Sequence, residues 1–179
     1  MSHSATLYRI TQGNFCEVVK VSGKKVKPID LSEGYTTFQG SFMALEYILS
    51  IGKEKVVADL VKEIFNPTQD IGGTDLRSIN FEAIGEEELW ALLDSVSYIP
   101  FEKVKEINKI LESISEEEVA NNYNAEELNK NGIYPRVWYN NNAEDQAFNK
   151  KHVMEDFREL RTFFSAAAEN DNNLLVYVE

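Results

Sequence analysis

The chain has 179 residues, of which 43% are hydrophobic and 27% charged, the proportions of one globular domain. Its formal net charge of −12 opposes nucleic-acid binding, because phosphate backbones require a basic surface. No stretch approaches the ~18 apolar residues of a membrane-spanning helix, and the start of the chain lacks signal-peptide features. We therefore expect a single soluble, cytoplasmic domain over residues 1–179, with a mobile terminus at residues 1–4 and neither nucleic-acid nor membrane partners.

The first part of the chain predicts one strand followed by helices. Alternating apolar residues predict a strand at Ala5–Ile10. Phe15–Val21 fits a helical face or one arm of a hairpin, and we favour the helix. Apolar residues at three- and four-residue spacing then predict helices at Ser41–Ile51 and Val56–Phe65. The glycine-containing segment Asp70–Asp75 is expected to be a loop.

Two further helices are expected on either side of Pro100. Glu86–Glu88 would stabilise the positive N-terminal end of the first one. Pro100 suits the first turn of the second, where its missing N–H costs nothing. The first helix would bury Leu89, Trp90, Leu92, Leu93 and Val96, and the second Val104, Ile107, Leu111 and Ile114.

Capping signals predict where the next helices begin. Ser115 stands three residues before Glu118, which is the spacing of a capping box and predicts a helix from Glu116. Asn124 and Glu127 repeat a weaker form of this signal.

The last elements are a long helix and a strand. The helix should run from about Asn149 to Glu169, and the strand Leu174–Val178 is apolar enough to be buried on both faces. One face of the helix would be buried: Val153, Phe157, Leu160, Phe164 and Ala167. The order of strands and helices predicts a single α/β domain.

Several segments of the C-terminal half together resemble the YfbM-like family, a group of small bacterial proteins whose function is not established. These segments are Tyr98–Val104, Leu111–Glu118, Asn131–Trp138 with its Ile-Tyr-Pro…Trp pattern, Glu155–Arg161 and Leu174–Val178. In the N-terminal half, Met43 and Glu46 stand where the family tends to place histidines. The resemblance implies a three-layer α/β/α-like sheet with many helices, and it implies no activity.

No catalytic or metal-binding pattern is present in the sequence. Cys16 would need a histidine base, but the two histidines, His3 and His152, are not placed beside it by any motif. An inert cysteine is therefore favoured, and metal-ligand spacings are absent. The glutamate runs at 86–88 and 116–118 are explained by helix starts. We expect no cofactor, and whether the chain is an enzyme stays open, with a non-enzyme favoured.

The strongest candidate binding surface surrounds Arg136. On a strand, Tyr134, Arg136 and Trp138 would share one face, and two aromatic rings beside an arginine are typical of binding surfaces. Because Pro135 interrupts it, Ile133–Trp138 should be an edge strand or an ordered loop. Alternatively, the two rings belong to the core. We expect a mostly buried Trp138 with Arg136 reaching solvent.

Two functions remain open on the sequence alone. The first is a non-catalytic binding or regulatory domain whose acidity suits a basic protein partner. The alternative is a small-molecule-binding protein or enzyme with a dispersed site around Arg136, in which Tyr134, Tyr123 or Glu46 would exchange protons. Arg158 and Arg161 are expected to pair with Glu155 or Glu159 on their own helix.

Overall fold

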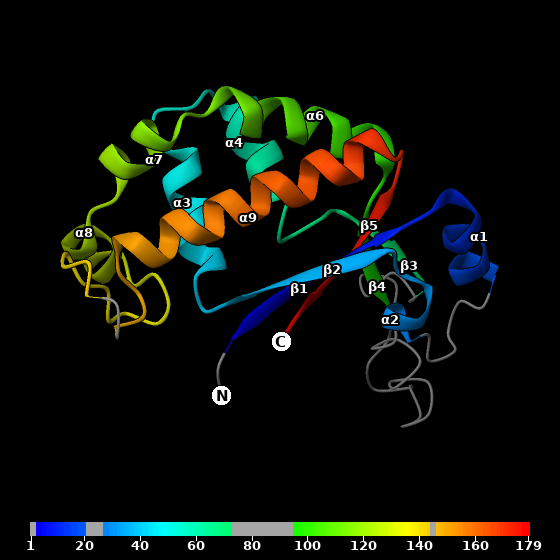
Figure 1. The fold of residues 1–179 in the computed structure, drawn as a ribbon, viewed down its shortest axis with the longest axis horizontal. Coiled ribbons are helices and arrows are strands. Elements are labelled where there is room, and N and C mark those ends of the chain that lie inside the picture. Colours follow the sequence, from blue (N-terminus) through cyan, green and yellow to red (C-terminus); the bar gives the residue numbers. More distant parts are fainter. Residues whose placement is uncertain (1–2, 21–26, 73–94, 144–145) are drawn as a thin grey trace, which may run out of the picture.

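A computed structural model describes residues 3–20, 27–72, 95–143 and 146–179 of the protein (Figure 1). Its sheet has five strands in the order β2-β1-β5-β4-β3, and every neighbouring pair is antiparallel. The strands are β1 (Ser4–Ile10), β2 (Gly34–Gln39), β3 (Gln69–Ile71), β4 (Val96–Ile99) and β5 (Asn173–Val178). The strands predicted at the two ends of the chain are thus neighbours near the centre of the sheet.

The central strand β5 is buried on both faces, as its apolar sequence predicted. Leu174 and Val176 belong to the main core, whereas Leu175 belongs to a smaller cluster with Ile10 and Val18. This division follows from the alternation of side chains along a strand. The sheet therefore contributes to two apolar clusters.

Most helices pack on one face of the sheet, with α9 lying across it (Figure 1). These helices are α3 (Phe42–Ser50), α4 (Lys55–Lys62), α6 (Phe101–Ser113), α7 (Glu116–Asn122) and α9 (Lys150–Glu169), with α8 (Ala125–Lys130) beyond the start of α9. The short helices α1 (Gln12–Lys20) and α2 (Pro28–Leu31) contribute Val18 and Leu31 to the second cluster. The α/β class is confirmed, and part of the second face is also covered by helices.

The helical predictions agree closely with the structure. All five residues predicted to face the core from the last helix are fully buried: Val153, Phe157, Leu160, Phe164 and Ala167. The predicted caps also form, since the Ser115 side chain accepts from the Glu118 N–H at 3.0 Å and that of Asn124 from the Glu127 N–H at 3.1 Å. Phe15 to Lys20 is helical, which supports the favoured alternative there, while Val21 lies outside the described residues.

Two local predictions were wrong because tertiary pairing decided the conformation. Asp70, expected in a loop, pairs with Ser97 in the β3–β4 ladder. Val96, expected at the end of a helix, begins β4; the rest of that predicted helix lies outside the described residues. Strands of three or four residues are too short to show a clear period in the sequence.

The start of β1 contacts two other parts of the fold. Residues 1–2 lie outside the described part, but His3 and Ser4 have defined contacts. The carbonyl of His3 accepts a hydrogen bond from the Gly40 N–H at 2.9 Å, and its ring meets Tyr134 edge-on with centroids 4.8 Å apart. Ser4 is the first residue of β1. These contacts join the start of β1 to the end of β2 and to the loop after α8.

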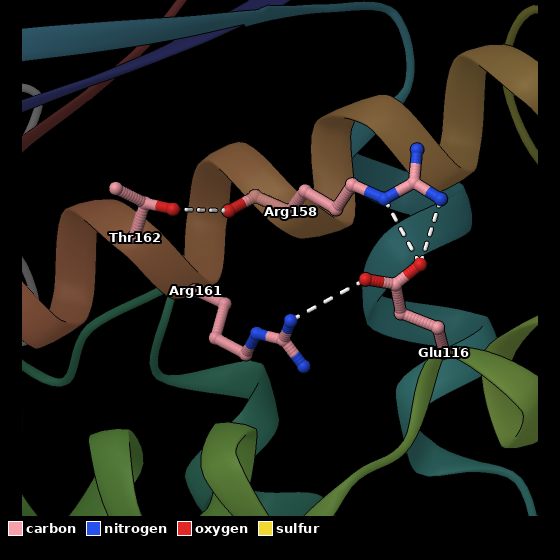
Figure 2. A network of polar contacts seen from close by, with 4 residues as sticks. All are labelled: Glu116, Arg158, Arg161 and Thr162. Atoms are coloured by element: carbon pink, nitrogen blue, oxygen red, sulfur yellow. Dashed lines mark hydrogen bonds and ion pairs between the residues drawn. The ribbon is translucent and has the colours of Figure 1, made fainter.

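The two arginines of α9 bind a different helix from the one predicted. Both point to Glu116 at the start of α7, as Figure 2 shows. Arg158 donates from Nε and Nη2 to the Oε2 atom of Glu116 at 2.9 and 2.7 Å, and Arg161 lies 3.4 Å from Oε1. The Arg158 hydrogen bond is the main cause that lowers the pKa of Glu116. The prediction of pairs with Glu155 or Glu159 considered only neighbours on one helix, and packing supplied a better acceptor.

Candidate functional site

Trp138 belongs to the core rather than to an open surface. Its side chain is 3% exposed and packs edge-on against the ring of Phe148, with centroids 5.6 Å apart. The indole N–H donates to the carbonyl of Ile133 at 3.0 Å, and the backbone N–H donates to the Asn129 side chain at 2.8 Å. Buried tryptophans usually satisfy their N–H in this way. Trp138 therefore anchors the loop that follows α8.

Arg136 and Tyr134 do not form one face with Trp138. The segment 133–138 is an ordered loop, the second of the two predicted forms, so the side chains do not alternate as they would on a strand. Arg136 is exposed, with a backbone φ of 66°, and its Nε–H donates to the carbonyl of Gly132 at 3.2 Å. Tyr134 is half-buried against His3. Pro135 removes one ladder donor, which favours the loop.

Tyr123 makes a structural contact through its hydroxyl. Its hydroxyl donates to the carbonyl of Tyr139 at 2.7 Å. Burial raises the pKa of Tyr123 to about 12, so the phenol stays protonated at neutral pH. Its ring also lies edge-on to that of Trp138, with centroids 6.5 Å apart. Tyr123 therefore ties α7 to the loop after Trp138.

Glu46 lies in a pocket of about 570 Å³, which we call the Glu46 pocket. The helix α3 supplies most of the lining, and the remainder comes from the turn after α4, the loop after α8 and the end of β5. The lining residues are Phe42, Met43, Glu46, Tyr47, Ser50, Ile51, Asn66, Ile133 and Val178. Of the five residues singled out in the sequence, Glu46 alone is among the described residues that line this pocket. A mainly apolar pocket with a few polar groups is the usual form of a ligand site.

The carboxyl group of Glu46 is partly withdrawn from solvent. Its Oε2 atom accepts a hydrogen bond from the Asn66 Nδ2 at 2.9 Å. Burial, the largest influence, raises the pKa of Glu46, while the Asn66 hydrogen bond and the charge of Lys62 act in the opposite direction. Within the described part of the chain, no hydrogen bond reaches Oε1. Glu46 thus presents one carboxylate oxygen that is available to a donor.

Tyr47 connects this pocket to α8. Its hydroxyl donates to Glu127 Oε1 at 2.5 Å and accepts from Asn131 Nδ2 at 3.0 Å. The hydrogen bond to Glu127 is the main cause that raises the pKa of Tyr47. Ile133, two residues beyond Asn131, lines the same pocket. These contacts hold the loop after α8 in place as one wall of the pocket.

The partners of Glu46 were not predicted from the sequence. Asn66 follows α4 and Ile133 follows α8, so only the fold brings them to α3. The glutamate at position 46 was a visible signal, because it interrupts the otherwise hydrophobic segment Phe42–Leu49. No comparable signal distinguished Asn66 or Tyr47.

Other chemically interesting groups are dispersed. Cys16 is a free, exposed thiol on α1. His152 Nδ1 accepts from the Phe148 N–H at 3.1 Å, and its Nε2 lies 3.4 Å from Asp156 Oδ2. Burial raises the pKa of Asp156. Across residues 3–20, 27–72, 95–143 and 146–179, no group of three or more His, Cys, Asp or Glu side chains could hold a metal ion.

Comparison with known proteins places the chain in a family. Residues 71–177 match the family described as a domain of unknown function, DUF1877, and the chain belongs to this family. A solved structure entitled a protein of unknown function, YfbM from Escherichia coli, has the same fold, with a TM-score of 0.64. The two chains are 14% identical, and the match covers 100% of each. No curated protein matches the chain. The YfbM-like relationship predicted from the C-terminal segments is thus confirmed.

In the described part of the chain, no helix is long and apolar enough to cross a membrane.

Proposed function

We propose that this domain is a non-catalytic binding domain that recognises a basic protein partner, with the Glu46 pocket as its recognition site. The observation that carries the proposal is a half-buried carboxyl group with one available oxygen, set among mainly apolar side chains. A carboxylate in such surroundings interacts with a cation more strongly than one in open water. The apolar lining adds contact area for the rest of the bound group.

The charge of the whole chain supports the same partner. A net charge of −12 would attract a basic protein during encounter and repel acidic ones. The pocket would then supply the specific contact. We also propose that the protein acts in the cytoplasm, since its single cysteine is an exposed free thiol, the form that a reducing compartment maintains.

An enzyme or small-molecule site around Arg136 has less support. The Nε–H of Arg136 is bound to the carbonyl of Gly132, and the Tyr123 hydroxyl is bound to that of Tyr139. Trp138 is buried. Arg136 Nε, the Tyr123 hydroxyl and the Trp138 ring therefore contact the loop after α8.

Co-purification at low salt tests the proposed function. The tagged wild-type protein, Glu46→Gln and Glu106→Gln would be used as baits. Glu106 is exposed on α6 and does not line the pocket. Glu106→Gln therefore removes the same charge as Glu46→Gln at a different place. We expect the wild type and Glu106→Gln to retain the same basic protein, and Glu46→Gln to lose it. Recovery of acidic proteins only, or equal recovery by all three baits, would contradict the proposal.

A further inference from the structure

We infer that the Glu46 pocket takes the side chain of a lysine from the basic partner, with the ammonium group at Glu46 and the aliphatic chain against the apolar wall. This inference rests on the proposed function and names the group that would be recognised. It follows from the number of acceptors in the pocket, the nature of its walls and the charges around it.

The pocket offers two hydrogen-bond acceptors on the same helix. One is the Oε1 atom of Glu46, since Oε2 is occupied by Asn66. The other is Ser50 Oγ, whose proton is donated to the carbonyl of Glu46 at 2.7 Å, so that its lone pairs remain available. An ammonium group has three donors and no acceptor, so it suits a site that offers acceptors. The Tyr47 hydroxyl is already donating to one partner and accepting from another.

This arrangement suits an ammonium better than a guanidinium. Arginine binds most strongly when its planar fork meets both oxygens of one carboxylate. At Glu46 such a pair would have to share Oε2 with the Asn66 amide. A lysine ammonium is a point charge and needs only Oε1. The single unshared carboxylate oxygen therefore favours lysine.

The walls match the remainder of a lysine side chain. Met43, Ile51 and Ile133 line the pocket, together with the exposed Val178 at the end of β5. Lysine buries its four methylene groups on apolar surface while its charged end finds a polar partner. A volume of about 570 Å³ also leaves room for the residues on either side of the lysine.

One cation of the chain itself opposes the incoming ammonium. Lys62 is exposed at the end of α4, and its charge acts to lower the pKa of Glu46. It forms no ion pair with Glu46 within the described residues. Lys62 therefore weakens the field at the pocket without filling it, and its replacement by methionine should strengthen lysine binding.

Titration with three short peptides tests the inference. The probes are acetyl-Gly-Gly-X-Gly-Gly-amide, where X is lysine, arginine or norleucine, and the methyl signals of Met43, Ile51 and Ile133 report binding by NMR. We expect the lysine peptide to bind at least about fivefold more tightly than the other two. Glu46→Gln should weaken its binding by about tenfold or more, and Lys62→Met should strengthen it about twofold. Glu106→Gln should leave it within about twofold of wild type. A urea unfolding curve for each variant shows that it is folded.

The outcomes separate the inference from the proposed function. If the arginine peptide binds as tightly as the lysine peptide and both depend on Glu46, the lysine inference is overturned while the basic-partner function stands. If the norleucine peptide binds equally well, or if Glu46→Gln changes nothing, the pocket does not recognise a cation. Both proposals then fail.

Discussion

At the scale of single residues, Glu46 is costly to the fold. It lies on a helix whose neighbours Leu45, Ile48 and Leu49 are buried in the main core. Burial raises the pKa of Glu46, which means that the folded state disfavours its charged form. Groups that cost stability and have no structural purpose are often found where a protein binds something.

The replacement Glu46→Gln should therefore leave the protein as stable as the wild type at pH 7, or more stable. For an acid with a raised pKa, the stabilising contribution is present below the unfolded pKa and is lost as the pH rises through the folded pKa. Glutamine carries no charge, so it avoids this loss of stability at higher pH. Its side-chain oxygen can still accept the hydrogen bond from Asn66. Urea unfolding at pH 4 and pH 7 measures the effect. A clear loss of stability at pH 7 would mean that Glu46 is structural.

Trp138→Ala should destabilise the protein by about 3–5 kcal/mol, the usual cost of removing a large buried aromatic side chain. The Trp138 ring packs against Tyr123 and Phe148. Removing the indole also leaves the carbonyl of Ile133 without its hydrogen-bond donor. Arg136→Ala is the control, with a change below about 0.5 kcal/mol because the side chain is exposed. Chemical denaturation of both variants distinguishes a core aromatic from a surface one.

Residue burial was easier to predict than polar partners. Apolar spacing located Leu160 and Phe157 in the core correctly, because a helix places every third or fourth residue on one face. The pairing of Arg158 with Glu116 was missed, since these residues are 42 positions apart and no local rule connects them. The same reason explains why Asn66 was not linked to Glu46.

At the scale of elements, α9 has one face in the core and another that binds α7. Leu160→Ala should cost about 2–5 kcal/mol, because it empties a fully buried position. Arg158→Gln should cause a much smaller change, because the pair with Glu116 is open to solvent and screened by salt. The urea unfolding midpoints of both variants, measured at low and high salt, show how much each face of α9 contributes to stability. A larger loss of stability for Arg158→Gln than for Leu160→Ala would contradict this ranking of the two faces.

The start of α9 gives a second prediction at this scale. The Asn149 side chain accepts from the His152 N–H, and its Nδ2 donates to the carbonyls of Ala143 and Gln146 at 2.9 and 2.8 Å. It is 1% exposed, so these bonds are not replaced by water when it is removed. Asn149→Ala should cost about 2 kcal/mol, against about 1 kcal/mol or less for Ser115→Ala at the exposed start of α7. Equal losses would show that burial adds nothing to the cap.

Helices were more predictable than strands. Caps and apolar stripes are local signals, and they located α3, α6, α7 and α9 within a residue or two. The strand β2 was missed, although Thr36 and Phe38 alternate into the interior, because threonine is polar and weakens the apolar pattern. The strands β3 and β4 depend on pairing with each other and with β5.

At the scale of the whole molecule, the Glu46 pocket is a product of topology. The end of β5, the helix α3 and the loop after α8 come together there, although they are distant in the sequence. The α/β class and the family could be predicted, because both depend on the order of elements and motifs. The pocket could not, since its position depends on how those elements pack.

The carboxyl pKa of Glu46, measured by NMR of its side-chain carbon with and without the basic partner, tests the central claim most directly. We expect the pKa to be above the ordinary glutamate value in the free protein, because the group is partly buried. Binding of a cation stabilises the carboxylate, so the pKa should fall when the partner is bound. Affinity should correspondingly be lost as the pH drops through the free-state pKa. A Glu46 pKa that is unchanged by a saturating amount of the partner would contradict the assignment of this pocket as the recognition site.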